Sequence, residues 1–222
     1  MFNKSYIQIK KNLKKSFSGL KKNKLAILGD TSTQFLKTII RGLGYDYNLD
    51  IEIWEADYDQ IPLQVYNQSS DLYKFNPDFV VVFKSSHKLL QKYNSEKSEN
   101  QSSFAINQIE EIKNIYSFIS QNINSKIIFY NFTEINDSVF GNFSNKVETS
   151  FLFQLRKINY LLMEFSISAP NLYICDLSSI QNQVGKVNFF HNSSYINNSM
   201  VLSVDVLPLV AKHTLDIIKT LK

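Results

Sequence analysis

The sequence predicts an α/β fold, a three-layer α/β/α sandwich with a mostly parallel sheet of about five strands. Short apolar segments alternate along the chain with longer segments of helical periodicity, which is typical of βαβ units. The clearest strand, residues 76–83 (NPDFVVVF), is apolar without alternation, as expected of a central parallel strand that is covered on both faces. With 222 residues, of which 44% are hydrophobic, the chain can bury a sizeable core.

The expected elements follow one another in βα order. Strands are predicted at 24–29, 49–55, 76–83, 126–130 and 172–176. Helices are predicted at 33–43, around Pro62, and at 104–122, 146–168 and 206–221. Two polar stretches, 91–103 and 181–200, are predicted as a surface loop and an irregular segment.

Residues 1–22 differ in charge from residues 23–222, which we expect to form the α/β domain. The first 24 residues hold eight lysines and no acidic residue, so the formal net charge of +4 leaves −4 on the rest. Apolar residues recur along this basic segment at helical spacing: Tyr6, Ile9, Leu13, Phe17 and Leu20. Such an amphipathic helix can bind an anionic membrane or nucleic acid, or it can pack its apolar stripe on the domain. We favour packing, and we expect no nucleic-acid partner because no other part of the sequence indicates one.

The composition also indicates where in the cell the protein works and whether it uses a metal or a cofactor. A single cysteine, Cys175, allows no internal disulfide, and no secretory signal or apolar run of about 20 residues is present, so we expect a cytoplasmic protein. We expect no metal, because the three histidines are far apart and neither H-x-x-x-H nor C-x-x-C occurs. We expect no cofactor, since the chain has no P-loop and no G-x-G-x-x-G motif.

Polar side chains follow four of the predicted strands, at the edge where parallel sheets bind ligands. These residues are candidate ligand-binding and catalytic residues: Gly29, Asp30, Thr31, Ser32, Gln34, Ser85, Ser86, His87, Asn131 and Asp176. Each has a simpler explanation, because hydroxyl and carboxylate side chains at such turns often only cap the next helix. If the site is catalytic, Thr31 or Ser32 would supply the hydroxyl at a helix N-terminus and His87 the base, with Asn131 as a further donor.

The segment ILGDTSTQ resembles the Gly-Asp-Ser block of SGNH (GDSL-type) hydrolases. The chain more closely resembles the N-terminal domain of FkbH-like proteins of the HAD superfamily, subfamily IIIC, through the stretches LAILGDTSTQFL, IEIWEADYDQI, NPDFVVVFKSSHKLL and LYICDLSSIQNQVG. The resemblance implies an SGNH-like fold with flavodoxin-like strand order. It also implies a bacterial biosynthetic role beside a HAD domain and an acyl carrier protein. The Asp-x-Asp-x-Thr/Val motif of a HAD domain is absent, so the HAD chemistry is not in this chain.

The SGNH catalytic pattern is incomplete in this sequence. The nucleophilic serine falls on Thr31, with Ser32 beside it, and the oxyanion asparagine falls on His87. Residues 55–59 lack the expected glycine, and no Asp-x-x-His precedes the last helix. Two hypotheses stay open: a domain that binds an acyl- or ester-type ligand or an acyl carrier protein with a degenerate catalytic site, or an active esterase or acyltransferase.

Overall fold

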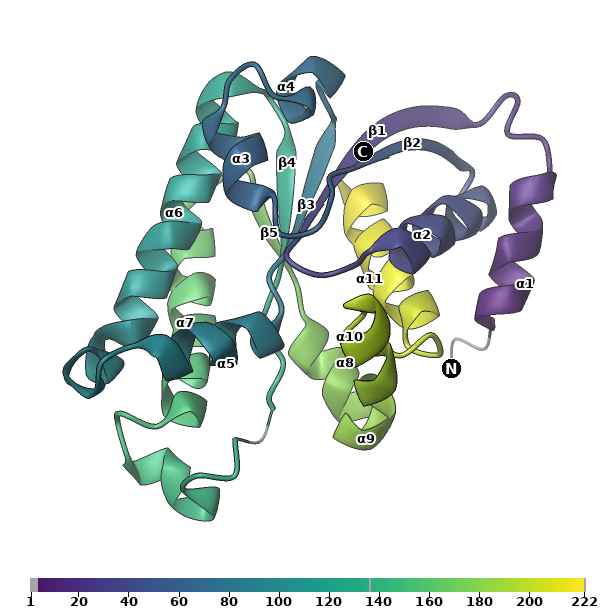
Figure 1. The fold of residues 1–222 in the computed structure, drawn as a ribbon. Coiled ribbons are helices and arrows are strands. Elements are labelled where there is room, and N and C mark those ends of the chain that lie inside the picture. The colour runs from purple at the N-terminus through teal and green to yellow at the C-terminus, as the bar shows by residue number, and fades with distance from the viewer. Residues whose placement is uncertain (1–3, 136, 222) are drawn as a thin grey trace.

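The fold is a five-stranded parallel sheet between two layers of helices (Figure 1). The computed structural model describes residues 4–135 and 137–221, without the side chains of 192–194. Its strands are β1 (Lys21–Gly29), β2 (Leu49–Glu55), β3 (Phe79–Phe83), β4 (Lys126–Tyr130) and β5 (Leu172–Cys175). They pair in the order β2-β1-β3-β4-β5, and every pairing is parallel. The predicted sandwich and its flavodoxin-like strand order are therefore confirmed.

Each face of the sheet has its own apolar core, because successive side chains of a strand point to opposite faces. Leu25 and Ile27 of β1 lie in one core, whereas Ala26 and Leu28 lie in the other. The first face is covered by α1 (Tyr6–Lys11), α2 (Gln34–Asp46), α8 (Leu177–Val184) and α11 (Leu207–Thr220). The second is covered by α3 (Ile61–Tyr66), α5 (Ser86–Ser95), α6 (Phe104–Asn122) and α7 (Phe151–Ser168). Shorter helices are α4 (Asp71–Phe75), α9 (Lys186–Phe189), α10 (Asn192–Asn198) and the 3₁₀ turns 12–14, 98–103 and 141–146.

Two stretches that were predicted to lack regular structure contain helices. Helix α5 occupies 86–95 and a 3₁₀ turn follows at 98–103, where the prediction was a loop over 91–103. Residues 181–200, predicted to be irregular, include the end of α8 and helices α9 and α10. In α5 only a few apolar side chains, Leu89 and Tyr93 among them, are buried on the domain, so its helical form depends on tertiary contacts that a mostly polar sequence does not reveal.

The N-terminal helix α1 is seated on α2. Ile9 is completely buried, and the buried side chain of Asn12 donates a hydrogen bond to the Gly42 carbonyl at 3.0 Å. A Cβ atom on Gly42 would lie 2.7 Å from the Ile9 carbonyl oxygen, so only glycine allows α1 to approach this closely. Strand β1 begins at Lys21, inside the basic segment 1–22. The apolar stripe of this segment therefore contacts the domain, while most of its lysines are exposed.

None of the helices among the described residues is both long and apolar enough to span a membrane.

Candidate functional site

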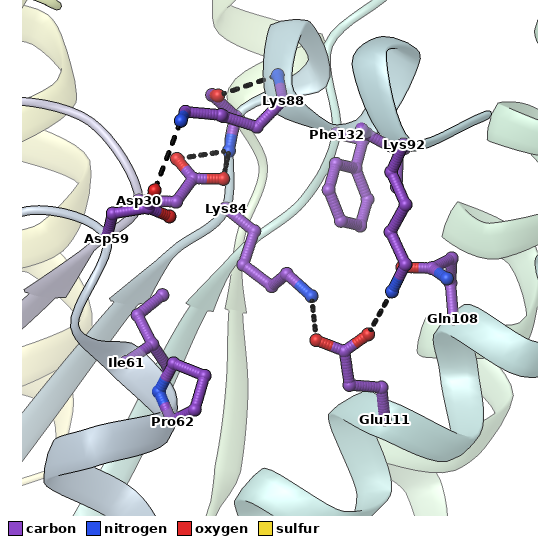
Figure 2. A pocket seen from close by; sticks show the side chains of 12 residues that line it. Asp30, Asp59, Ile61, Pro62, Lys84, Lys88, Lys92, Gln108, Glu111 and Phe132 are labelled. Atoms are coloured by element: carbon purple, nitrogen blue, oxygen red, sulfur yellow. Dashed lines mark hydrogen bonds and ion pairs between the residues drawn. The ribbon is translucent and has the colours of Figure 1, made fainter. Parts of the chain in front are cut away.

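A cavity of about 220 Å³ opens at the carboxyl ends of β1 and β3 (Figure 2). This is the point where the strand order changes direction, since β2 lies on one side of β1 and β3 on the other. The cavity lies on the α3, α5 and α6 side of the sheet. Four apolar residues line it: Ile61, Pro62, Leu89 and Phe132. The larger set of lining residues is polar or charged: Asp30, Asp59, Lys84, Ser85, Lys88, Lys92, Gln108 and Glu111.

Asp30 lines this cavity and comes directly after β1. Its side chain is buried, and both of its carboxylate oxygens lie 2.9 Å from the Ser85 backbone nitrogen, which donates to them. Burial raises the pKa of Asp30 from 3.8 to about 7, against the opposing effects of the Ser85 hydrogen bonds and of nearby Lys84 and Lys88. Around neutral pH the cavity therefore contains a carboxyl group that readily gains or loses a proton.

The candidate nucleophile Thr31 is enclosed by the protein. Its exposed fraction is 0%, and its Oγ1 atom has no hydrogen-bond partner among the described residues. The turn that carries it is tight, because a Cβ atom on Gly29 would meet the Thr31 carbonyl oxygen at 2.7 Å. The neighbouring Ser32 backbone nitrogen donates to the Ser199 carbonyl at 2.9 Å, so the segment before α11 packs directly on this turn.

His87, the candidate base, lines a different hollow from Asp30 and Ser85. Its ring contacts Phe190 and Tyr195, with ring centroids 5.0 and 4.8 Å apart. Burial lowers the pKa of His87, and its buried Nδ1 atom has no hydrogen-bond partner within residues 4–135 and 137–221. The second hollow, of about 480 Å³, is lined by His87, Glu134, Ile135, Lys186, Val187, Phe190 and His191.

Ser32 and Gln34, also predicted for the site, line a third and smaller hollow of about 120 Å³. Glu55 lies there too, and its carboxylate accepts a 2.5 Å hydrogen bond from the Thr33 hydroxyl.

The remaining predicted residues make hydrogen bonds within the fold. Ser85 caps α5 by accepting from the Lys88 backbone nitrogen, and Ser86 donates to the Thr133 carbonyl at 2.6 Å. Asn131 donates to Asp176 at 2.7 Å. Asp176 in turn caps α8 by accepting from the Ser179 backbone nitrogen at 3.0 Å. Ser85 and Asp176 thus cap helices, as polar residues at strand ends often do, whereas Ser86 and Asn131 link neighbouring segments.

The structure thus brings Asp30 and Ser85 together, whereas Thr31 is enclosed, His87 lines a second hollow and Asn131 pairs with Asp176.

Sequence reasoning missed the basic and acidic residues of the main cavity. Lys84, Lys88 and Lys92 recur every four residues, a spacing that places side chains on one side of a helix. This spacing was the sequence signal that could have indicated a basic cluster. Glu111 of α6 has no such signal, because its proximity to these lysines arises only when α6 packs beside α5 (Figure 2).

Within the described residues, no group of three or more histidine, cysteine, aspartate or glutamate side chains is arranged to hold a metal ion. The lining of the main cavity offers ammonium, amide and carboxyl groups to a ligand.

Solved structures resemble this domain over most of its length. The N-terminal part of protein BF1531 from Bacteroides fragilis, which contains a phosphatase domain and was solved with Mg, has a TM-score of 0.93 at 38% identity. That match covers 99% of this chain and 57% of the other, so the chain spans little more than half the length of this relative.

Two more distant structures share the fold. A protein from Parabacteroides merdae described as a GDSL-like lipase has a TM-score of 0.54 at 13% identity, covering 92% of this chain and 99% of its own. An acetyl xylan esterase, AlAXEase, has a TM-score of 0.50 at 13% identity, covering 88% and 99%. At this identity the likeness shows an SGNH-like fold and nothing about activity.

No curated protein matches the chain significantly. The model of the FkbH N-terminal domain matches residues 24–219, nearly the whole sequence. With the 38% identity to the BF1531 structure over 99% of the chain, this match shows that the protein belongs to the FkbH N-terminal domain family.

Proposed function

We propose that this domain binds an acyl- or ester-type ligand, free or attached to an acyl carrier protein, and does not hydrolyse it. The observation that carries the proposal is the contrast between Thr31 and the cavity next to it. The hydroxyl at the nucleophile position is fully buried and has no hydrogen-bond partner among the described residues, whereas the neighbouring cavity is open and lined by groups that can bind a ligand. Removal of one triad member typically costs several orders of magnitude in the rate of such hydrolases.

The cavity suits a short acyl group in its size and walls. Its volume of about 220 Å³ is below the roughly 300–1,000 Å³ of pockets for drug-sized ligands. Ile61, Leu89 and Phe132 offer an apolar surface to a hydrocarbon chain, and the amide of Gln108 and the ammonium groups of the lysines can bind a polar end. Apolar surface for a chain and placed polar groups for one end are both features of small-molecule sites.

The competing function is an active esterase or acyltransferase that uses Thr31 or Ser32 with His87. A hydroxyl nucleophile needs a base within about 2.6–3.2 Å. Neither Thr31 Oγ1 nor His87 Nδ1 has a hydrogen-bond partner among the described residues, so the two do not form such a pair in this arrangement. The unpartnered nitrogen of His87 is the feature that keeps the alternative worth testing.

The longer relative suggests the setting in which the domain works. The BF1531 structure contains a phosphatase domain, and this chain covers 57% of that structure. We place the present domain in a bacterial biosynthetic pathway, beside a HAD-type phosphatase domain and an acyl carrier protein. In that setting it would retain an acyl ligand while chemistry takes place elsewhere.

Turnover of 4-nitrophenyl acetate and butyrate separates the two functions. We expect the purified protein and its Thr31→Ala, Ser32→Ala and His87→Ala variants all to match the uncatalysed rate. Activity clearly above background in the unmodified protein, lost in the Thr31 or His87 variant, would contradict the proposal and establish the esterase. A known GDSL esterase in the same assay is the positive control.

A further inference from the structure

The cavity contains an uneven set of charges. Lys84, which precedes α5, extends its ammonium group across the cavity toward α6, and its side chain is only 14% exposed (Figure 2). Lys92 of α5, eight residues further along the chain, approaches the same place. Burying an ammonium group is costly unless an anion accompanies it. The partner of both lysines is Glu111 of α6.

Glu111 is shared between the two lysines. Its Oε1 atom lies 2.6 Å from Lys84 Nζ, and its Oε2 atom lies 2.7 Å from Lys92 Nζ. Burial raises the pKa of Glu111, but the two ammonium groups outweigh burial and hold the pKa below its usual value. A single carboxylate therefore faces two positive charges, and one positive charge is left over.

The other charged groups of the cavity do not remove this excess. Lys88 pairs with Asp59 at 3.2 Å, which makes a neutral pair at the rim. Asp30, the remaining acid, has a pKa of about 7 and is largely uncharged in mildly acidic solution. Lys92 Nζ also donates to the Gln108 amide oxygen at 3.2 Å, but that amide carries no charge.

Building on the binding function proposed above, we propose that the ligand of this cavity carries a single anionic group, which binds Lys84 and Lys92 beside Glu111 while its chain lies on Ile61, Leu89 and Phe132. Each ammonium group has three N–H donors, so both lysines can bind a ligand oxygen and retain Glu111. Glu111 limits the positive charge, and the cavity accordingly selects a carboxylate-type monoanion over a neutral acyl compound.

Butyrate and butyramide test this selectivity, because they have nearly the same shape and differ in charge. We expect NMR titration at pH 6 and constant ionic strength to give butyrate an affinity about tenfold or more above that of butyramide. Shifts should appear at Ile61, Leu89 and Phe132. Inorganic phosphate, a third probe without a hydrocarbon chain, should bind more weakly than butyrate.

Two substitutions in the cavity are expected to change butyrate affinity in opposite directions. Lys92→Met should lower butyrate affinity about tenfold and leave butyramide unchanged, whereas Glu111→Gln should raise butyrate affinity. Lys113→Met and Glu110→Gln are matched controls, because these two residues form an exposed pair elsewhere on α6 and should change neither affinity. Amide spectra of each variant show whether it remains folded.

The outcomes separate this inference from the function on which it rests. Equal binding of butyrate and butyramide, or a butyrate affinity that Lys92→Met leaves unchanged, overturns anion selection and leaves acyl binding in place. Phosphate binding more tightly than butyrate overturns the carboxylate preference. If no probe shifts the cavity residues, both the inference and the proposed binding function fail.

Discussion

Replacing Asp30 with asparagine is expected to stabilise the protein at pH 8 and to flatten the pH dependence of its stability between about pH 4 and 7. The folded-state pKa of Asp30 is about 7, above its ordinary value of 3.8, so the folded state binds more protons than the unfolded state in this interval. The free energy of unfolding therefore decreases as the pH rises through it. The full shift corresponds to at most about 4 kcal/mol, which asparagine, having no charge, would recover at high pH.

Urea denaturation of the unmodified protein and of Asp30→Asn at pH 4, 6 and 8 measures this effect. The two curves should nearly agree at pH 4, where Asp30 is already protonated, and diverge at pH 8. Asp59→Asn is the matched control: it removes a carboxylate from the same cavity, but from a side chain that is 63% exposed. A difference between Asp30→Asn and the unmodified protein that does not vary with pH would show that Asp30 is not the buried titrating group.

Replacing Gly42 with valine is expected to lower the free energy of unfolding by about 2–4 kcal/mol and to release α1 from the domain. The added Cβ atom would lie 2.7 Å from the Ile9 carbonyl oxygen and 3.0 Å from Ile9 Cγ2, so the helix must move away. The movement would expose Ile9, which is 0% exposed, and would break the buried hydrogen bond from Asn12.

Amide hydrogen exchange identifies the released segment. Exchange should accelerate at residues 6–14 and much less in β4 and β5. Thr38→Val, one turn earlier on α2, introduces the same side chain at a partly exposed position and should have little effect on α1. If Gly42→Val leaves exchange of residues 6–14 unchanged, the close packing of α1 against Gly42 is wrong. The basic segment would then be an independent arm.

The sheet was predictable because its signals are local. The apolar runs at 79–83 and 126–130 contain their own evidence for buried strands, and both strands occur in the structure. Boundaries were less predictable. Strand β3 begins at Phe79 rather than at Asn76, because Asn76 has a left-handed backbone (φ 48°) and ends α4, and Pro77 follows it.

The site was predictable only in part. The sequence pointed to the turn after β1 and to the residues after β3, and Asp30 and Ser85 do meet there. The accessibility of Thr31 could not be read from neighbouring residues, because the segment at Ser199 that packs on its turn is distant in the chain.

Local sequence signals were enough to predict the layers of this protein, the buried parallel sheet and the edge of the sheet that carries the cavity, but not helices α5, α9 and α10. These properties follow from the periodicity of apolar residues and from the short connections between elements, which are both local properties of the sequence. Only the packing of distant segments encloses Thr31 and brings Lys84 and Lys92 to the same carboxylate, Glu111. Burial and charge pairing depend on which distant segments pack together, and a side chain's chemistry changes with the neighbours that packing supplies.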